Sequence, residues 1–428
     1  MADAGQYRKI RDIVLSDPER KVVVVSAAGK RDKHDHKITD LLYLCYAHTQ
    51  YGVDCSGIFE MIASRYLQIR DDLGIRLDLE SDLAKLKARI DSKSVTQEEL
   101  VSRGEYFSAK LMAAYLSFQF IDAVDWVKFN FDGTVDLDST YDALRNRFWG
   151  KGVVIPGFYG MLPDGHIKTF SRGGSDITGS LAAAALDADV YENWTDVSGC
   201  LVADPRIIDN PKPIKVITYR ELRELSYMGA SVLHEDAIFP VRSMGIPINI
   251  RNTNDPEAAG TLIVASTCQK PEFTITGIAG KKGFVAVNID KDKMNSEIGF
   301  CRKTLQAFEE NNISIEHMPS GIDTMTVFVH QEEFEGKEQQ VISAIRQNAH
   351  PDSIELESDL GLIAVVGRGM RSTRGTAGRI FSALAHANIN IRMIDQGSSE
   401  LNIIIGVSND DFEKAIEAIY DIFVKTQL

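Results

Sequence analysis

The sequence predicts an α/β protein, with a mainly parallel sheet covered by helices on both faces and followed by two ferredoxin-like modules. Short β-branched runs that enter Gly-rich turns alternate with helical segments over residues 1–265, which is typical of a parallel sheet. Residues 266–271 have the composition of a linker, and an internal repeat follows them. The chain has 428 residues, enough for two or three domains. We predict domains over 1–265 and 272–428.

Composition and charge exclude several classes of function. The chain carries 47 Lys and Arg against 61 Asp and Glu, a formal net charge of −14, which argues against non-specific binding to nucleic acid or to anionic membranes. No apolar stretch is long enough for a transmembrane helix, and the first residues do not resemble a secretory signal. The five cysteines are scattered without a C-x-x-C pair. We therefore expect reduced thiols in a cytoplasmic protein.

The elements of the N-terminal part follow from hydrophobic periodicity. Residues 9–15 have helical spacing, and 21–26 form a continuous β-branched run, typical of a strand buried on both faces. Residues 120–123 and 152–157 are predicted as further strands that enter turns. The remaining predicted elements are an Ala-rich helix over 181–188, a helix over 219–228 and a strand over 248–251.

The C-terminal part contains two copies of one unit. Residues 312–316 (Asn-Ile-Ser-Ile-Glu) match residues 388–392 (Asn-Ile-Asn-Ile-Arg), 76 positions further along the chain. At the same offset Gly299 aligns with Gly375. Each copy is predicted as a strand, a Gly-containing turn, a helix and an N-I-x-I strand, which favours paired ferredoxin-like modules. We expect these modules to bind a small ligand at an interface.

The strongest local signal for chemistry is segment 169–180. Gly173 and Gly174 allow the backbone to approach a ligand, and the helix that follows offers free N–H groups to a phosphate or carboxylate. Arg172 adds a bidentate donor for an anion. Asp176 can orient a nucleophile, a donor group or a Mg²⁺ ion. The alternative is an ordinary N-cap turn, in which a Ser, Asp or Thr side chain caps the helix and Arg172 is solvated.

Small-residue turns also follow two other predicted strands, at 26–30 and 156–160. Ligands of open α/β sheets bind outside the carboxyl ends of the strands, so three converging turns indicate a ligand site. Each turn alone is more simply an ordinary tight turn. Glu105, close to Arg103 in the sequence, is suited to a substrate ammonium, or else lies at a solvated helix end.

Two other polar clusters carry competing interpretations. Segments 193–199 and 203–206 are a candidate nucleotide pocket, or else Trp194 packs in the core and its neighbours form turns. His34 and His36 suggest a metal site, but a solvated loop explains them more simply. We predict no metal site.

Together these segments resemble the aspartate kinases (aspartokinases) of the amino acid kinase family. The C-terminal repeat resembles the tandem ACT domains of the same proteins, especially at 363–367 and 389–394. The resemblance covers nearly the whole chain and implies an amino acid kinase fold followed by two ACT domains. Its other matching segments are 23–30, 37–42, 102–105, 156–160, 170–178, 194–197, 204–206 and 229–234.

The resemblance implies that the chain uses ATP and Mg²⁺ to phosphorylate the β-carboxylate of L-aspartate. The product is 4-phospho-L-aspartate, the entry to lysine, threonine, methionine and diaminopimelate biosynthesis. It implies catalytic roles for Asp176 and Arg172. The residues implied to hold aspartate are Thr39, Glu105, Phe158, Arg172 and Ser175. Those implied to contact ATP are Ser26, Gly29, Gly173, Gly174, Thr195, Asp196 and Arg206.

The resemblance also implies feedback regulation through the first ACT module. Lysine is the expected effector, with threonine as the alternative. Glu316 would offer its carboxylate to a cationic ammonium, or else it lies on a solvated strand face. ACT pairing implies a homodimer or homotetramer. The residues implied to bind the effector are Met294, Gly299, Phe300, Ser314, Ile315, Glu316 and Ser320.

Three departures from the family pattern concern the nucleotide. The family begins with a strand that ends in Lys-Phe-Gly-Gly, whose lysine neutralises the phosphates of ATP, and this motif is absent from the sequence. Leu201 and Ser231 also differ from many relatives. We expect either a start upstream of Met1 or a shortened, inactive kinase that acts as an amino-acid-binding regulator. No dehydrogenase segment follows Leu428, which suggests the monofunctional type. Another amino acid kinase, acting on glutamate or carbamate, is disfavoured by the ACT pair and by 170–178.

Overall fold

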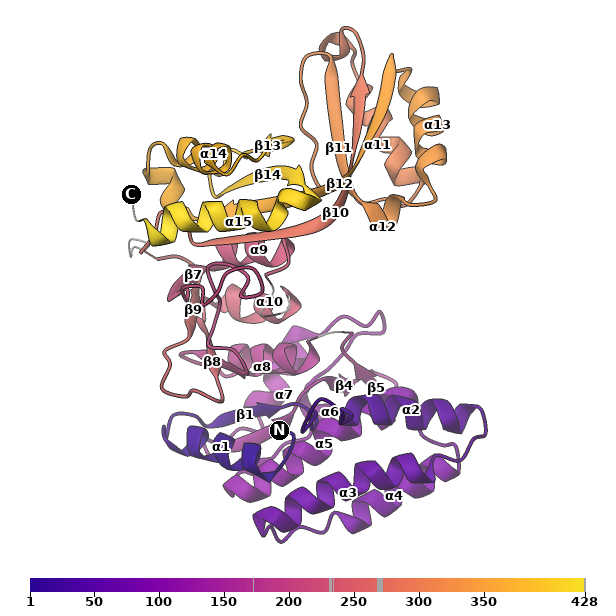
Figure 1. The fold of residues 1–428 in the computed structure, drawn as a ribbon. Helices are drawn as coiled ribbons and strands as arrows, with labels where there is room; N and C mark the ends of the chain where they lie inside the picture. The colour runs from indigo at the N-terminus through magenta and orange to yellow at the C-terminus, as the bar shows by residue number, and fades with distance from the viewer. Residues whose placement is uncertain (172, 231–232, 234, 268–271, 427–428) are drawn as a thin grey trace. The chain divides into compact units, whose positions relative to one another are not determined.

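The computed structural model describes residues 1–171, 173–230, 233, 235–267 and 272–426 (Figure 1). By its internal contacts the chain forms two units, Met1–Gly199 with Leu233–Ala265, and Cys200–Val232 with Ser266–Leu428. The second unit thus includes residues 200–232 from the middle of the chain. The domain boundary between 265 and 272 stays a prediction.

The strands of the first unit form a parallel sheet, a mixed sheet and a hairpin. In the parallel sheet the order is β1-β3-β2, and Val22 of β1 and Gln119 of β2 both lie opposite Val153 of β3. In the mixed sheet β6 pairs in parallel with β8, which pairs antiparallel with β9. The bounds are β1 Val22–Val25, β2 Gln119–Phe120, β3 Val153–Pro156, β4 Tyr159–Met161, β5 Ile167–Thr169, β6 Tyr191–Thr195, β8 Ile248–Asn252 and β9 Thr261–Val264.

Helices of the first unit pack their apolar faces into a core that also includes Val25 of β1 and Val154 of β3. Tyr7, Tyr66 and Phe107 are buried there, on α1, α3 and α5. The long helices α3, α4 and α5 lie side by side (Figure 1). The bounds are α1 Ala4–Leu15, α2 Ile38–Gln50, α3 Ser56–Leu73, α4 Glu80–Asp91, α5 Gln97–Leu116, α6 Ala123–Trp126, α7 Leu137–Arg145, α8 Gly174–Ala185 and α10 Glu235–Met244.

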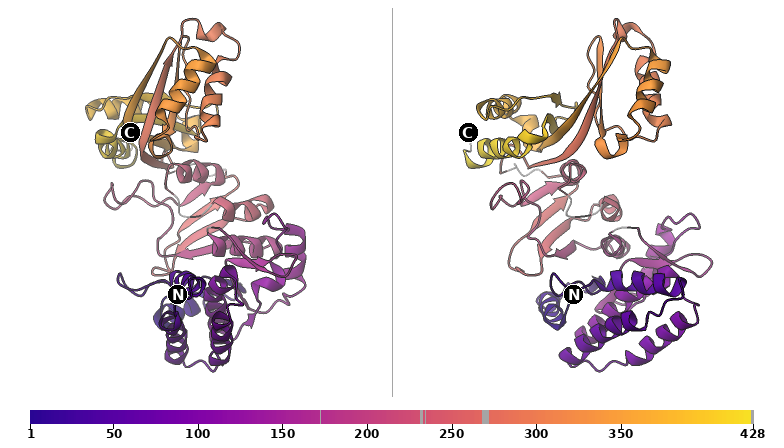
Figure 2. Two further views of the ribbon diagram at one scale, coloured as in Figure 1. Left: turned by 90° about the vertical axis from the view of Figure 1, so that its right-hand side faces the viewer. Right: turned by 45° about the vertical axis from the view of Figure 1, so that its right-hand side comes forward.

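The second unit is built on a sheet with the order β11-β10-β12-β14-β13 (Figure 2). The long strands β10 and β12 pair antiparallel along their whole length, and each serves both modules. Residues 284–290 of β10 pair with β11, whereas 360–366 of β12 pair with β14. The strand bounds are β7 Val216–Thr218, β10 Gly277–Asp290, β11 Thr324–His330, β12 Ser353–Val366, β13 Met393–Asp395 and β14 Asn402–Ser408. The helix bounds are α9 Tyr219–Tyr227, α11 Phe300–Glu310, α12 Gln331–Phe334, α13 Glu338–Ala349, α14 Thr376–His386 and α15 Phe412–Tyr420.

The predicted repeat is confirmed, because β10 and α11 recur 76 positions later as β12 and α14. Gly299 and Gly375 begin the two helices with φ angles of 87° and 81°, and Asn312 and Asn388 follow them with φ angles of 52° and 55°. These left-handed positions suit glycine and asparagine.

The prediction that both N-I-x-I segments are strands is wrong, since both are turn and coil. Their isoleucines Ile313 and Ile389 are buried. The apolar alternation therefore anchors a loop in the core rather than a paired strand.

Two predictions in the first unit also need correction. The strand predicted over 120–123 ends at Phe120, because the side chain of Asp122 accepts a hydrogen bond from the N–H of Val124 and caps α6. The Ala-rich helix begins at Gly174, not at 181. The Gly-rich motif therefore forms the first turns of α8 itself.

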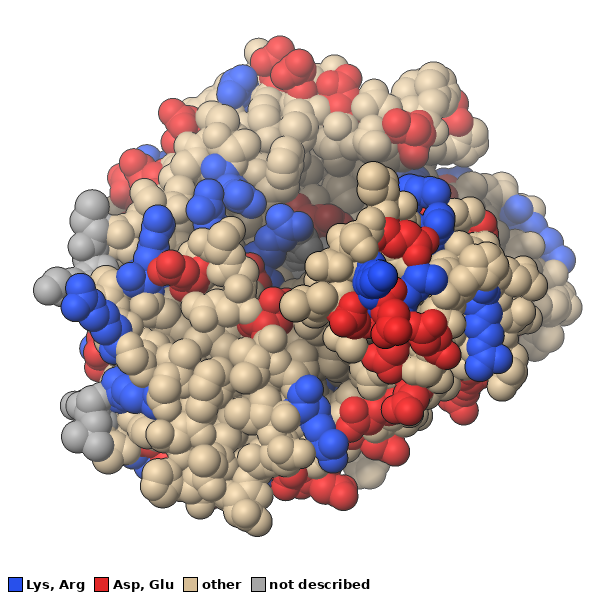
Figure 3. All heavy atoms as spheres, turned by 90° about the horizontal axis from the view of Figure 1, so that it is seen from above, with Lys and Arg blue, Asp and Glu red and all other residues tan. Residues whose placement is uncertain are grey.

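The described part of the chain contains no helix that is long and apolar enough to cross a membrane. Cys45, Cys55, Cys200 and Cys301 are free thiols, whereas Cys268 lies outside the described residues. Basic side chains are scattered over the face that Figure 3 shows and form no continuous surface, whereas several acidic side chains gather right of its centre.

Candidate active site

The carboxyl ends of β1 and β3 bring two of the predicted turns together. The N–H of Gly157 donates to the carbonyl of Val25 (3.0 Å), which places Ser26 beside Gly157. A Cβ atom on Gly157 would lie 2.7 Å from the Cα of Ser175. Glycine at this position therefore allows the turn after β3 to contact the start of α8. The three turns converge where ligands of open α/β sheets bind.

The start of α8 is open for an anion. Gly173 is the N-cap with a φ of 58°, and α8 has no side-chain cap among the described residues. Thr178 instead accepts from the N–H of Phe158 (3.1 Å) and donates to the carbonyl of Gly174 (2.8 Å). The structure therefore does not support the interpretation of an ordinary capped turn. The first N–H groups of α8 form the positive end of the helix dipole.

Phe158 adopts a strained backbone at this point. Its φ is 81°, which is a genuine outlier for a bulky residue. A Cβ atom on Gly174 would lie 2.9 Å from the Cα of Phe158. Such strain is typical of residues that the surrounding structure holds in place at a functional site.

Glu105 is a buried carboxyl group in the middle of α5. Its Oε1 accepts from the N–H of Ala27 (3.1 Å), and its Oε2 has no partner among the described residues. Burial raises the pKa of Glu105 to about 8. The alternative of a solvated helix end is therefore wrong, because only 5% of Glu105 is exposed. A cationic group that reached Oε2 would stabilise the charged carboxylate.

Gly104 lets α5 approach the turn after β1. A Cβ atom on Gly104 would lie 2.8 Å from the Cβ of Ala27. The N–H of Ile38 donates to the carbonyl of Ala28 (3.1 Å), which connects the same turn to the start of α2. Thr39 in the first turn of α2 is half-buried, as is Gly29. Thr39, Gly29 and Glu105 thus lie around one turn.

Several of the predicted site residues line a cavity of about 550 Å³. Ser26, Ser175, Asp176, Thr195 and Asp196 all line it. Its volume lies within the roughly 300–1,000 Å³ of small-molecule sites. The structure therefore brings together four residues that the resemblance assigns to aspartate or ATP and Asp176, to which it assigns a catalytic role.

This cavity lies against strand edges. Every residue of Val22–Val25 and of Tyr191–Thr195 lines it. Since successive residues of a strand point to opposite faces, β1 and β6 present their edges to the cavity. The prediction that β1 is buried on both faces is wrong, because only Val25 is fully buried. Within the described residues β1 pairs only with β3.

Asp176 faces β6 across the cavity wall. Its Oδ1 accepts from Nδ2 of Asn193 (2.9 Å), and its carbonyl accepts from the hydroxyl of Tyr191 (3.3 Å). Asn193 is buried, whereas Asp176 is half-buried. The hydroxyl of Thr195 donates to Asp196 (3.2 Å). Sequence reasoning included Asn193 only as the start of a polar stretch and gave no role to Tyr191.

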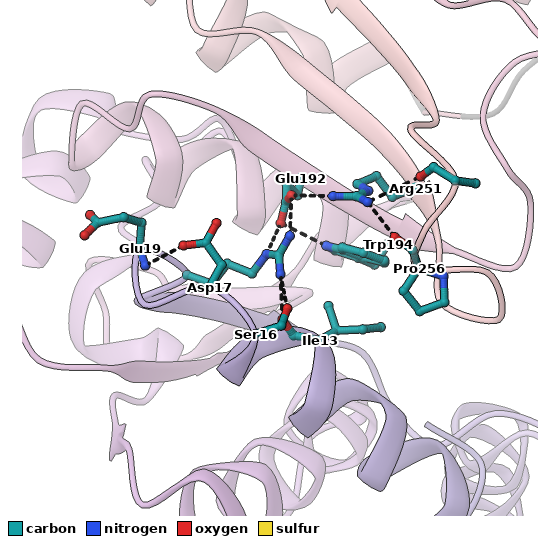
Figure 4. Close-up of polar contacts among 10 residues, drawn as sticks. Ile13, Ser16, Asp17, Glu19, Glu192, Trp194, Arg251 and Pro256 are labelled. Atoms are coloured by element: carbon teal, nitrogen blue, oxygen red, sulfur yellow. Dashed lines mark hydrogen bonds and ion pairs between the residues drawn. The ribbon is translucent and has the colours of Figure 1, made fainter.

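The opposite side of β6 carries an ion-pair cluster that sequence reasoning missed (Figure 4). Glu192 accepts from Arg20 (2.7 Å), from Arg251 (3.3 Å) and from the indole N–H of Trp194 (3.1 Å). Both guanidinium groups lie over the Trp194 ring, 4.7 Å away for Arg251 and 5.4 Å for Arg20. The partners lie far apart in the sequence, so local pattern gives no signal for them.

Several predicted residues are not placed in this cavity. Arg172 and Ser231 lie outside the described residues. Arg206 and Leu201 belong to the second unit, where Arg206 pairs with Asp204 through two hydrogen bonds of 3.0 Å.

The side chains of the His34–His36 cluster do not converge on a common point in the way that metal ligands would. Asp35 between them pairs with Arg65 at 2.7 Å, and a hydrogen bond from Arg31 holds the pKa of Asp35 well below its usual range. His34 and His36 are exposed. Among the residues that the structure describes, no three His, Cys, Asp or Glu side chains form a metal-binding group.

The predicted effector residues surround the start of α11. Met294 and Phe300 are buried in the core of the first module, and Gly299 is the N-cap of α11. Ile315 packs against this core, whereas Ser314 and Ser320 are exposed.

Glu316 does not lie on a solvated strand face. Its side chain is only 7% exposed and lies 3.3 Å from Nε2 of His330. Burial and a hydrogen bond with Glu316 both raise the pKa of Tyr227. The carboxylate is therefore enclosed by polar groups of the same unit.

Comparison with known proteins identifies the family. The sequence profile of the amino acid kinase family matches residues 1–252, and that of an ACT domain matches 363–423. The chain therefore belongs to the amino acid kinase family, and an ACT domain follows the kinase part.

Within that family the chain belongs to the aspartokinases. It is 40% identical to aspartokinase 3 of Bacillus subtilis, with 99% of this chain and 96% of that protein aligned. The crystal structure of Clostridium acetobutylicum aspartate kinase matches with a TM-score of 0.91 and 48% identity, over 99% of this chain and 97% of that chain. E. coli aspartokinase III in complex with lysine and aspartate matches with a TM-score of 0.73 and 25% identity, over 99% and 97%.

Proposed function

We propose that this enzyme transfers the terminal phosphoryl group of ATP to the β-carboxylate of L-aspartate. The observation that carries the proposal is the cavity in which the open start of α8 meets Ser26, Thr195 and Asp196. The buried carboxyl of Glu105 lies at the same turn as Ser26, through its hydrogen bond with Ala27. The relative from E. coli, whose structure holds lysine and aspartate, supports the choice of substrate.

The nucleotide part of the site would bind Mg-ATP as a substrate. Phosphoryl transfer depends mostly on positioning and on neutralising developing negative charge. The N–H groups that follow Gly173 and Gly174 would bind phosphate oxygens, and the hydroxyl of Ser26 would donate a hydrogen bond to another phosphate oxygen. Thr195 and Asp196 would contact the nucleoside. Gly29 and Arg206 remain predicted ATP contacts.

The aspartate part of the site would use the polar groups around the turn after β1. Glu105 would face the α-ammonium, which in turn would lower the pKa of Glu105 from about 8. Thr39, Phe158 and Ser175 would position the substrate, and Arg172 would hold a carboxylate. Asp176 would organise the geometry of transfer.

We further propose that lysine regulates the enzyme through the first ACT module, with threonine as the alternative effector. The structure of the E. coli relative with lysine supports this choice. Glu316 would exchange part of its contact with His330 and Tyr227 for the ammonium of lysine. A coupling free energy of about 1–3 kcal/mol between the two sites is typical of allostery.

The remaining proposals concern context. The kinase domain would span 1–265 and the tandem ACT domains 272–428, in a cytoplasmic homodimer or homotetramer. The reaction would open lysine, threonine, methionine and diaminopimelate biosynthesis.

A direct assay tests the reaction. ADP release with Mg-ATP is measured with aspartate, with glutamate and without an amino acid, and the acyl phosphate is trapped with hydroxylamine. We expect hydroxamate and ADP with aspartate alone. Turnover with glutamate, or ADP release at the same rate with and without aspartate, would contradict the proposal.

One observation favours a second function, an amino-acid-binding regulator without kinase activity. The basic side chains that line the cavity among the described residues, Arg20 and Lys21, are paired with Glu192 and Glu19. Each would have to share or leave its carboxylate partner to neutralise phosphates. Calorimetric binding of lysine without any aspartate-dependent turnover would support this alternative.

A further inference from the structure

We propose that Asn193 and Tyr191 are positioning residues that fix the carboxylate of Asp176 for phosphoryl transfer. The inference rests on the proposed function, because Asp176 is placed in the transfer site there. The sequence motifs give Tyr191 no role and include Asn193 only as the first residue of segment 193–199. Their position on β6, directly opposite the first turn of α8, carries the argument.

Three hydrogen bonds link Asp176, Asn193 and Tyr191. Nδ2 of Asn193 donates both to Oδ1 of Asp176 (2.9 Å) and to the hydroxyl of Tyr191 (3.2 Å). That hydroxyl donates to the backbone carbonyl of Asp176 (3.3 Å). Burial raises the pKa of Tyr191, so that its hydroxyl keeps its proton across the working pH range. One strand thus holds both the side chain and the backbone of Asp176.

Glycine on α8 makes room for this contact. Gly179 lies almost one turn beyond Asp176, and a Cβ atom there would lie 2.7 Å from the hydroxyl oxygen of Tyr191. Gly179 is buried inside α8, where glycine costs about 1 kcal/mol relative to alanine. A close approach of Tyr191 explains why glycine stands at this position.

The far side of β6 holds the strand in register. Glu192 and Trp194 point away from α8, because side chains alternate along a strand. Arg251 binds Glu192 and lies over Trp194 (Figure 4), and Arg20 also binds Glu192 and lies over Trp194. A register slip of one residue would turn Asn193 away from Asp176. The contacts of Glu192 and Trp194 with the two arginines therefore hold β6 in the register that keeps Asn193 beside Asp176.

The hydrogen bond from Asn193 restricts how the carboxylate of Asp176 rotates. With Oδ1 engaged, the second oxygen has one preferred direction, and both Asp176 and Asn193 line the cavity. Positioned groups contribute to rate by removing rotational freedom before the transition state. Loss of the donor is thus expected to lower kcat more than it raises KM.

Isosteric substitutions test the proposal. Asn193→Leu removes the donor at similar size and is expected to lower kcat about tenfold, with KM for Mg-ATP within about twofold of the parent. Asn193→Asp places a carboxylate against Asp176 and is expected to lower kcat further. Tyr191→Phe keeps the ring beside Gly179 and is expected to have a smaller effect. Asn193→Gln keeps the amide donor and is expected to recover part of the loss.

Asn249→Leu is the matched control. Asn249 lies on β8 opposite Glu192, on the sheet face turned away from Asp176. We expect its kcat to stay within about twofold of the parent. A parental kcat for Asn193→Leu, or an equal loss in Asn249→Leu, would overturn the proposal.

A measurement without turnover separates this inference from the proposed function. In a double-mutant cycle of Asn193→Leu and Asp176→Leu, thermal unfolding midpoints are expected to be non-additive, because the residues are in contact. Additive midpoints would overturn the positioning role even in an active enzyme. Non-additive midpoints in a chain without aspartate-dependent turnover would overturn the proposed function but would still support the contact between Asn193 and Asp176.

Discussion

The buried carboxyl of Glu105 makes the stability of the protein depend on pH. Burial raises the pKa of Glu105 from its ordinary 4.5 to about 8. Below pH 4.5 the group is protonated in the folded and unfolded states and has no effect. Between pH 4.5 and 8 the unfolded state releases the proton and the folded state keeps it. The free energy of unfolding therefore falls by about 1.4 kcal/mol per pH unit, and by about 5 kcal/mol in all.

The substitution Glu105→Gln is expected to remove this dependence. Glutamine is uncharged at every pH, so the free energy of unfolding of the variant stays flatter than that of the parent between pH 5 and 8. The difference is measured by urea denaturation at half-unit pH steps. Glu60→Gln is the matched control, since Glu60 is exposed on α3 and the parental slope should be retained.

The same pKa predicts a proton signature for binding. An ammonium beside Glu105 favours the carboxylate, so aspartate binding at pH 7 is expected to release nearly one proton. Calorimetry in two buffers of different ionisation enthalpy measures it. The raised pKa of Glu105 would be refuted if the free energy of unfolding had the same pH dependence in the parent and in Glu105→Gln and aspartate binding released no proton.

Three other predictions follow from single contacts. Gly157→Ala is expected to destabilise the protein by about 1–3 kcal/mol and to reduce turnover, because the new methyl group would meet Ser175. A parental unfolding midpoint would contradict this, and Gly57→Ala, where the added atom has open space and the backbone is not left-handed, is the control. Glu316→Ala is expected to raise the lysine concentration for half-inhibition at least about tenfold, measured as turnover with and without lysine, and equal inhibition in variant and parent would exclude Glu316 from the effector site. A Lys-Phe-Gly-Gly strand fused ahead of Met1 is expected to pair with the edges of β1 and β6 and to raise aspartate-dependent ADP release, whereas a fusion with Ala in place of Lys is expected to raise the unfolding midpoint without raising turnover. Equal activity of the two fusions would show that the lysine is dispensable.

The sequence predicted much of the framework because the relevant signals are local. The repeat appears as β10 and β12, and as α11 and α14, with the predicted offset of 76. The Gly-rich motif at 169–180 begins a helix with an open N-terminus, because Gly173 can adopt a left-handed backbone. Both features depend on neighbouring residues and their conformational preferences.

The tertiary structure alone decided the electrostatics of the site. Burial of Glu105 depends on how α5 packs against the turn after β1, and no local pattern distinguishes it from an exposed glutamate on the same helix. Arg20 meets Glu192 across 172 residues of sequence, and Asn193 meets Asp176 only because β6 passes α8. The exposure of one edge of β1 to the cavity likewise follows from the order of strands in the sheet, and the β-branched residues of β1 do not predict it. Local preference selects elements, but burial and charge pairing arise from long-range packing.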